Sequence, residues 1–211
     1  MNFFDRRQAG QILSQKLNDY KGDKEILILG LPRGGVVVAE EVAQTLRAPM
    51  DVVLLRKLPY PPQPELAVGA VAEDGNIFIN EEFRAAVERQ PNSLEPIVSE
   101  QIKIIQNRAK LYRPHRHARG WRGKTVILVD DGIATGATMK VAIRAARSGG
   151  ANRVVVAVPV AAFSSILELQ TEADEVVCLD TPEYFYAVGQ AYENFDQVTD
   201  EEVCAILDRN P

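Results

Sequence analysis

Cysteine is scarce in this sequence, and long apolar runs are absent from it. The 211 residues include two cysteines, Cys178 and Cys204, which are too few and too far apart for a disulfide framework or a cysteine metal site. No apolar run approaches the roughly 20 residues that cross a bilayer, and the N-terminus carries no signal-peptide pattern. We therefore expect a cytoplasmic protein with no membrane partner.

Excess positive charge is also missing. The formal net charge is −5, which argues against nucleic acid as a partner for the surface as a whole. The length is enough for one substantial core, so we expect residues 1–211 to form a single domain with an attached subdomain.

The common nucleotide-binding signatures are absent as well. The chain has no G-x-G-x-x-G, and its most glycine-rich loop, after Val129, lacks the lysine that precedes the final Ser/Thr of a P-loop. A dinucleotide or P-loop site is thereby excluded at this loop.

What the chain does contain is an apolar strand followed by two acids and a loop of small residues. Residues 126–129 are apolar and mostly β-branched, as in a strand of a parallel sheet. Asp130 and Asp131 follow, and a helical pattern starts near Met139. Ligands of open α/β sheets bind beyond the strand ends, where a helix N-terminus attracts phosphate. Carboxylates accept hydrogen bonds from a sugar diol, so this stretch predicts a sugar-phosphate site formed by Asp130, Asp131, Gly132, Ala134, Thr135, Gly136, Ala137 and Thr138. A ligand-free turn is the alternative.

This stretch resembles the phosphoribosyl-pyrophosphate (PRPP) motif of type I phosphoribosyltransferases: four apolar residues, two acids, then T-G-x-T. The resemblance implies that Asp130 and Asp131 hold the ribose hydroxyls, acting as catalytic residues, and that the loop holds the 5′-phosphate. It further implies Mg²⁺-dependent transfer of the phosphoribosyl group to a nitrogen nucleophile, such as a nucleobase, with release of pyrophosphate. A homodimer is implied too.

A second glycine turn follows the strand predicted over residues 25–31. In Pro32, Arg33, Gly34 and Gly35, the glycines would let backbone N–H groups reach an anion at a helix N-terminus, and the arginine would add a forked donor. The turn resembles the pyrophosphate loop of the same family. A tight connection without a ligand is the alternative.

Residues 56–69 form a proline-rich stretch that predicts a flexible loop with few backbone hydrogen bonds, closing over the ligand. Arg56, Lys57 and the more loosely matched Glu65 resemble the catalytic loop of adenine phosphoribosyltransferases. Arg56 and Lys57 would bind pyrophosphate, and Lys57 and Glu65 would take part in catalysis. The residues up to Val71 and those at 77–79 predict a hairpin.

An aromatic stretch lies within residues 180–198, which we call the hood segment. Its run from Tyr186 to Glu193 resembles the base-binding hood of hypoxanthine-guanine enzymes, with Tyr186 and Ala187 at the base and Glu193 near Mg²⁺ together with Asp130 and Asp131. Packing over the sheet is the alternative. The 6-oxopurine enzymes carry an acid where Ala134 stands and a lysine that residues 158–160 lack. The pattern therefore resembles adenine and orotate enzymes more closely.

Strands predicted at 25–31, 52–55, 126–129, 154–158 and 175–179 alternate with helices. This order predicts a doubly wound, mostly parallel five-stranded sheet flanked by helices, with a small hood to which the N-terminal helix also contributes.

Residues 113–124 carry five basic side chains and no acid, as in a solvated loop or a polyanion contact. One alternative function is therefore a non-catalytic PRPP or nucleotide sensor that binds RNA through this segment. A synthetase-like PRPP enzyme is another.

Overall fold

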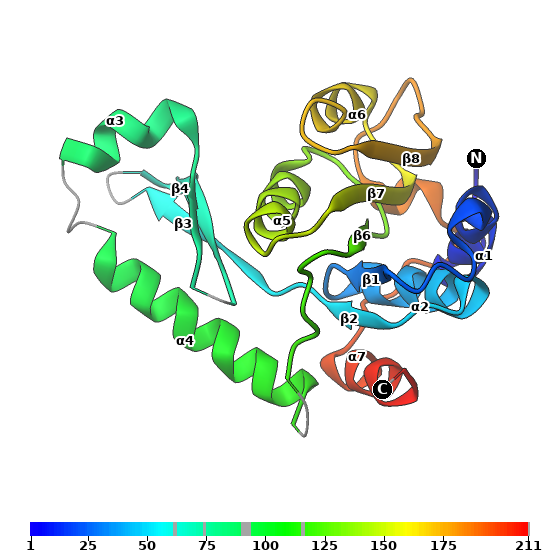
Figure 1. Ribbon diagram of the computed structural model, residues 1–211. Coiled ribbons are helices and arrows are strands. Elements are labelled where there is room, and N and C mark those ends of the chain that lie inside the picture. The colour runs from blue at the N-terminus through cyan, green and yellow to red at the C-terminus, as the bar shows by residue number, and fades with distance from the viewer. Residues whose placement is uncertain (61–62, 74, 90–93, 115–116, 211) are drawn as a thin grey trace.

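A five-stranded parallel sheet forms the centre of the computed structural model (Figure 1). The structure describes residues 1–60, 63–73, 75–89, 94–114 and 117–210, with the backbone alone at 63–67, 81, 82, 86 and 88. In spatial order the strands are β2 (Met50–Val52), β1 (Ile26–Gly30), β6 (Thr125–Val129), β7 (Arg153–Val160) and β8 (Glu175–Asp180). The strand expected at residues 52–55 is β2, which starts two residues earlier and ends three residues earlier.

Alternate residues of each strand face two separate cores. Ile26 and Ile28 pack with α1 (Arg6–Lys16), α2 (Gly34–Leu46) and α7 (Asp200–Arg209). Leu27 and Leu29 pack instead with α5 (Ala137–Ser148) and α6 (Phe163–Leu169). Because both faces are covered, the inner strands β1, β6 and β7 are almost entirely apolar. The predicted doubly wound sheet is confirmed.

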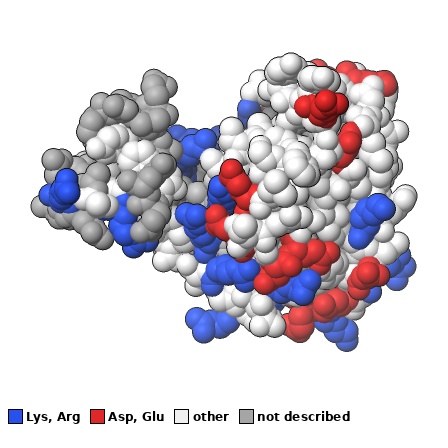
Figure 2. All heavy atoms as spheres, turned by 90° about the horizontal axis from the view of Figure 1, so that it is seen from above, with Lys and Arg blue, Asp and Glu red and all other residues white. Residues whose placement is uncertain are grey.

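A second, antiparallel sheet extends away from the first (Figure 1). It contains β3 (Leu55–Tyr60), β4 (Gln63–Ala72) and β5 (Ile77–Ile79), and it is followed by α3 (Glu81–Arg89) and the long α4 (Glu95–Tyr112). We call residues 55–112 the projecting lobe. Seen from above, Lys and Arg side chains gather where this lobe meets the body (Figure 2).

The hairpin predicted from the residues up to Val71 and from residues 77–79 is confirmed by the antiparallel pairing of β4 with β5. The expectation of few backbone hydrogen bonds over residues 56–69 is wrong, because β3 pairs with β4 from Leu55↔Ala72 to Leu58↔Gly69. Pro59 is tolerated because the register shifts on both sides of it, as prolines in sheets commonly require. Pro61 and Pro62 lie outside the described residues.

The chain start lies beside the hood segment. Phe3 forms a parallel bridge with Tyr192, and backbone hydrogen bonds join Phe3 to Ala191 and Glu193. The 3-10 turns η1 (Asn18–Tyr20) and η3 (Val188–Ala191) complete the described elements. In the part of the chain that the structure describes, we find no helix of sufficient length and apolarity to span a bilayer.

Candidate active site

Two loops start side by side at the carboxyl edge of the sheet. Gly30, the last residue of β1, pairs with Val129, the last of β6, and the N–H of Leu31 donates to the carbonyl of Val129 at 2.8 Å. The chain then continues as the 31–35 turn on one strand and as the 130–138 loop on the other. The sheet therefore brings together the two loops that were singled out from the sequence.

The contact between these loops leaves no space for side chains at two positions. A Cβ on Gly34 would lie 1.8 Å from Oδ2 of Asp131, and one on Gly35 would lie 2.7 Å from the Cα of Asp130. Close approach to the two acids therefore requires both glycines. The peptide bond between Pro32 and Arg33 is cis.

The two acids differ in their surroundings. Asp131 accepts a hydrogen bond from Nε of Arg6 at 2.7 Å, and the two side chains are 15% and 11% exposed, respectively. Asp130 accepts one from the backbone N–H of Asp131 at 2.9 Å. Burial, and then the charge of Asp131, raises the pKa of Asp130 well above its ordinary value. Asp131 is therefore an ion-paired carboxylate, whereas Asp130 holds its proton more tightly than an ordinary aspartate.

Arg6 links the acids to the hood segment. Its guanidinium lies 3.8 Å from the centre of the Phe195 ring, and Nη1 donates to the carbonyl of Asp196 at 2.8 Å. Tyr192 donates its hydroxyl to the carbonyl of Asp131 at 2.5 Å, and burial raises the pKa of this phenol. Sequence reasoning missed Arg6 altogether and assigned Tyr192 only to the aromatic stretch.

The 132–138 loop is anchored by hydrogen bonds to neighbouring elements on one side, and several of its side chains are exposed on the other. Ser165 donates its hydroxyl to the carbonyl of Ala134 at 2.7 Å, and Ile133 donates its N–H to Val160 at 3.0 Å. Gly136 has a φ of 71°, which glycine adopts without strain, and α5 begins at the next residue without a side-chain cap. Ala134, Thr135, Ala137 and Thr138 are exposed. The first turn of α5 thus presents backbone N–H groups and hydroxyls to an anion.

The turn at residues 31–35 faces the base of the projecting lobe across a small cavity of about 60 Å³. Pro32, Arg56 and Thr138 line it. Arg56 donates Nε to Oε1 of Gln101 on α4 at 2.9 Å. Lys57 is exposed and does not line this cavity, whereas Glu65 lies in β4 and its side chain is outside the described residues.

A family model for the phosphoribosyl transferase domain matches residues 5–195. The chain belongs to this family. Among its relatives are proteins from two strains of Mycobacterium tuberculosis, each named provisionally as a phosphoribosyl transferase and 46% identical over 207 residues, 98% of this chain. The chain spans only 46% of the length of those relatives.

Solved structures show the same fold. TT1426 from Thermus thermophilus superposes with a TM-score of 0.89 at 44% identity, over 100% of this chain and 99% of that one. The AQ2163 protein from Aquifex aeolicus, at 15% identity and a TM-score of 0.52 over 87% and 78% of the chains, resembles it in fold alone. The architecture is that of type I phosphoribosyltransferases.

In this phosphoribosyl transferase domain, the hood residues singled out from the sequence form hydrogen bonds with residues other than Asp130 and Asp131. Tyr186 is 81% exposed, and its N–H and that of Ala187 donate to Oε1 of Gln190 at 2.7 and 2.9 Å. Glu193 accepts from Nδ2 of Asn2 at 3.3 Å. Within the described residues, no group of three His, Cys, Asp or Glu side chains could hold a metal ion. The placement of Glu193 near Mg²⁺ with Asp130 and Asp131, mostly through substrate and water, stays a prediction.

The basic segment 113–124 is partly occupied by internal contacts. Arg113, whose side chain is 2% exposed, donates to Glu73 and lies 3.6 Å from Asp51. Arg119 donates its backbone N–H to Asp51 at 3.0 Å and its Nε to the carbonyl of Met50 at 3.3 Å. His115 and Arg116 lie outside the described residues. Two of the basic side chains therefore tie this segment to strand β2 and the end of β4.

Proposed function

We propose that this domain transfers the 5-phosphoribosyl group from PRPP to a nitrogen nucleophile in a Mg²⁺-dependent reaction that releases pyrophosphate. The observation that carries the proposal is the contact between the two loops, with Gly34 and Gly35 against Asp131 and Asp130. A sugar whose diol reaches the acids has its 5′-phosphate at the start of α5 and its pyrophosphate at the 31–35 turn. Family membership and the PRPP-like stretch support the same function.

Each part of the substrate has its own residues in this proposal. Asp130 and Asp131 accept hydrogen bonds from the ribose hydroxyls, and Asp131 also balances positive charge that develops on the ribose. The backbone of residues 132–138, with the hydroxyls of Thr135 and Thr138, binds the 5′-phosphate. Arg33, Arg56 and Lys57 neutralise the leaving pyrophosphate. The fixed geometry of the three groups lowers the entropic cost of reaching the transition state.

The donor set fits Mg²⁺ only if the substrate supplies most ligands. Asp130 and Asp131 are adjacent carboxylates, and no third acid joins them among the described side chains. Mg²⁺ commonly binds one or two carboxylates together with waters and substrate phosphates, so this pair is compatible with it. When bound, the ion neutralises charge on the departing pyrophosphate.

The acceptor is proposed as a nucleobase beneath the hood segment, with Tyr186 and Ala187 as its contacts and Glu65 as a proton relay. Ala134 occupies the position at which 6-oxopurine enzymes carry an acid, which favours an adenine- or orotate-like acceptor over hypoxanthine or guanine. The cytoplasmic location, the single domain and the homodimer expected from the sequence are also part of this proposal.

The alternative, an RNA-binding regulator, receives less support from the geometry. It relies on the basic segment 113–124, and Arg113 and Arg119 already contact Asp51, Glu73 and Met50. Salt-dependent RNA retention that disappears in the Arg116→Gln and Arg119→Gln variants would favour this function.

A nucleobase panel tests the proposal. The protein is incubated with PRPP, Mg²⁺ and each of adenine, orotate, uracil, hypoxanthine and guanine, and pyrophosphate release is measured. We expect release with at least one base and none in the Asp131→Asn variant. A thermal shift with millimolar PRPP but no release with any base would favour the sensor, whereas no shift at all would overturn the sugar-phosphate site.

A further inference from the structure

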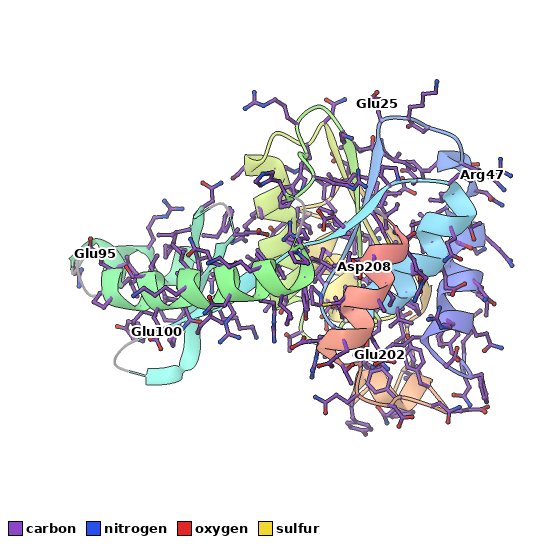
Figure 3. All side chains as sticks on the ribbon, turned by 90° about the horizontal axis from the view of Figure 1, so that it is seen from below. Glu25, Arg47, Glu95, Glu100, Glu202 and Asp208 are labelled. Carbon is purple, nitrogen blue, oxygen red and sulfur yellow. The ribbon has the colours of Figure 1, made fainter. Side chains whose placement is uncertain are left out.

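A second arginine lines the small cavity beside the 31–35 turn. The walls of this cavity are mostly apolar, and Arg108 of α4 lines it together with Arg56. Figure 3 shows how α4 arrives there: it begins in the projecting lobe near Glu95 and ends beside α7, which Glu202 and Asp208 mark. No pattern in the sequence had connected α4 with the loops.

Arg108 forms a long ion pair with Asp200 that holds its guanidinium only loosely. Its Nη2 lies 4.0 Å from Oδ2 of Asp200, beyond hydrogen-bond distance, and its guanidinium lies 5.9 Å from the centre of the Tyr112 ring. The side chain is 39% exposed. Among the described residues none accepts a hydrogen bond from its guanidinium, so its N–H donors are available to a ligand.

The surroundings of Tyr112 place another arginine in the same area. Burial, and then the hydrogen bond that Tyr112 donates to Asp200, raises the pKa of this phenol, while the charges of Arg108 and Arg33 act in the opposite direction. Arg56 and Arg108 line the cavity, and so does Pro32, which Arg33 follows directly in the chain. Arginines from three separate elements therefore lie in or next to the lining of one cavity.

Helix α4 also positions Arg56. Gln101, which accepts from Nε of Arg56 at 2.9 Å, precedes Arg108 by two helical turns, so the two side chains lie on the same face of the helix. One face of α4 thus holds one arginine and presents another. Ile104 and Ile105 line the same cavity, and apolar walls lower the local dielectric constant, which strengthens the attraction of an anion.

We propose that Arg108 binds the pyrophosphate group of PRPP together with Arg33 and Arg56, while Asp200 and Tyr112 hold its guanidinium beside the cavity. The inference rests on the proposed function, because it names a further residue for the same substrate. It also assigns α4 a direct part in the site.

The test measures binding of three ligands by isothermal titration calorimetry: PRPP with Mg²⁺, pyrophosphate with Mg²⁺, and ribose 5-phosphate, which lacks the pyrophosphate group. We compare wild type with Arg108→Gln, Arg108→Lys and the control Lys110→Gln. Lys110 is exposed on the same helix and the control removes the same charge. For Arg108→Gln we expect PRPP and pyrophosphate to bind about tenfold more weakly or worse, with ribose 5-phosphate unchanged. Arg108→Lys should be intermediate, and Lys110→Gln should match wild type.

Two results would overturn the inference alone: wild-type binding of PRPP and pyrophosphate by Arg108→Gln, or an equal loss for ribose 5-phosphate, which would indicate a general structural role. The melting temperature without ligand checks that Arg108→Gln folds, and Arg108→Lys provides the comparison if it does not. Failure of the wild type to bind PRPP would instead overturn the proposed function and the inference with it.

Discussion

Arg6 and Asp131 form an ion pair at 2.7 Å although 125 residues separate them in the chain. The pair joins the first helix to the end of the central strand β6, with the hood segment packed on the arginine through Phe195. A ribose diol that binds Asp131 must either share this carboxylate with Arg6 or displace the arginine. The hydrogen bond from Arg6 thus fixes the orientation of the Asp131 carboxylate, which is proposed to bind the ribose diol.

Replacing Arg6 by Gln should weaken folding, and it should weaken PRPP binding because Arg6 no longer holds the Asp131 carboxylate in place for the diol that shares it. Loss of a largely buried charge-assisted hydrogen bond costs about 1.5–3 kcal/mol in the free energy of unfolding. Arg6→Lys should recover part of this, since an ammonium keeps the charge but cannot reproduce the fork. Urea unfolding and calorimetry with PRPP provide the measurements. Arg122→Gln, at an exposed position, is the control. Unfolding energies equal to wild type for Arg6→Gln would contradict the structural role of the pair.

Asp131→Asn should weaken PRPP binding by about 1.5–3 kcal/mol, the usual contribution of a hydrogen bond to a charged group. The carboxamide keeps the size of the side chain but carries no charge for the diol. Calorimetric titration with PRPP and Mg²⁺ measures the effect. Asp208→Asn, exposed on α7, removes a carboxylate far from the loops. Equal affinities for Asp131→Asn and wild type would mean that the acid is structural.

Gly34→Ala should disturb the contact between the loops. Its Cβ would lie 1.8 Å from Oδ2 of Asp131, so the turn or the acid must shift, at a cost of about 1–3 kcal/mol in the free energy of unfolding. We expect PRPP binding to fall in parallel. Gly120→Ala is the matched control, because a Cβ there meets nothing within 4 Å. A Gly34→Ala variant that binds PRPP like wild type would argue against this turn as a ligand loop.

The pH dependence of the free energy of unfolding should reveal the raised pKa of Asp130. Its pKa is raised in the folded protein by burial and by Asp131, so the folded state holds this proton more tightly than the unfolded state does. The resulting loss of stability is absent below the unfolded value of about 3.9 and grows as pH rises towards the folded value. Asp130→Asn removes this term. Relative to wild type, the variant should gain stability progressively as pH rises above the unfolded value of about 3.9, as measured by urea unfolding. A difference independent of pH would show that Asp130 does not titrate in this way.

The parts of the fold that depend on local patterns were predictable. Residues 126–129 are apolar because the strand is covered on both faces, and the following acids and glycines mark the loops at its end. The proline-rich stretch was a misleading pattern, since a register shift at Pro59 accommodates a residue that would otherwise interrupt a ladder. Apolar positions Leu58, Val68 and Val71 then pack into the same core as Ile105.

The roles of Arg6 and Arg108 depend on contacts between distant elements, and a sequence has no local sign of these. In the sequence, Arg6 is an ordinary residue in the first turn of a helix. Arg108 is one more member of a polar helix face. Each gains its role only when the sheet order places β1 beside β6 and when α4 returns from the projecting lobe to α7.

Backbone pairing in the hairpin leads to the last prediction. The four residue pairs from Leu55↔Ala72 to Leu58↔Gly69 form a regular ladder, and Leu58 and Val71 are fully buried. Amides in such a ladder exchange slowly unless the core opens. We therefore expect hydrogen exchange to show protection of residues 55–58 and 69–72 without ligand, with β1 as the fully buried reference.

Binding of PRPP and Mg²⁺ should then add little protection to these amides, because any closure over the ligand would move the hairpin as a unit about its base. Fast exchange at residues 55–58 without ligand, followed by protection with PRPP, would contradict this prediction. It would also indicate that Arg56 and Lys57 become ordered only when the substrate binds, as in a lid that folds over its ligand.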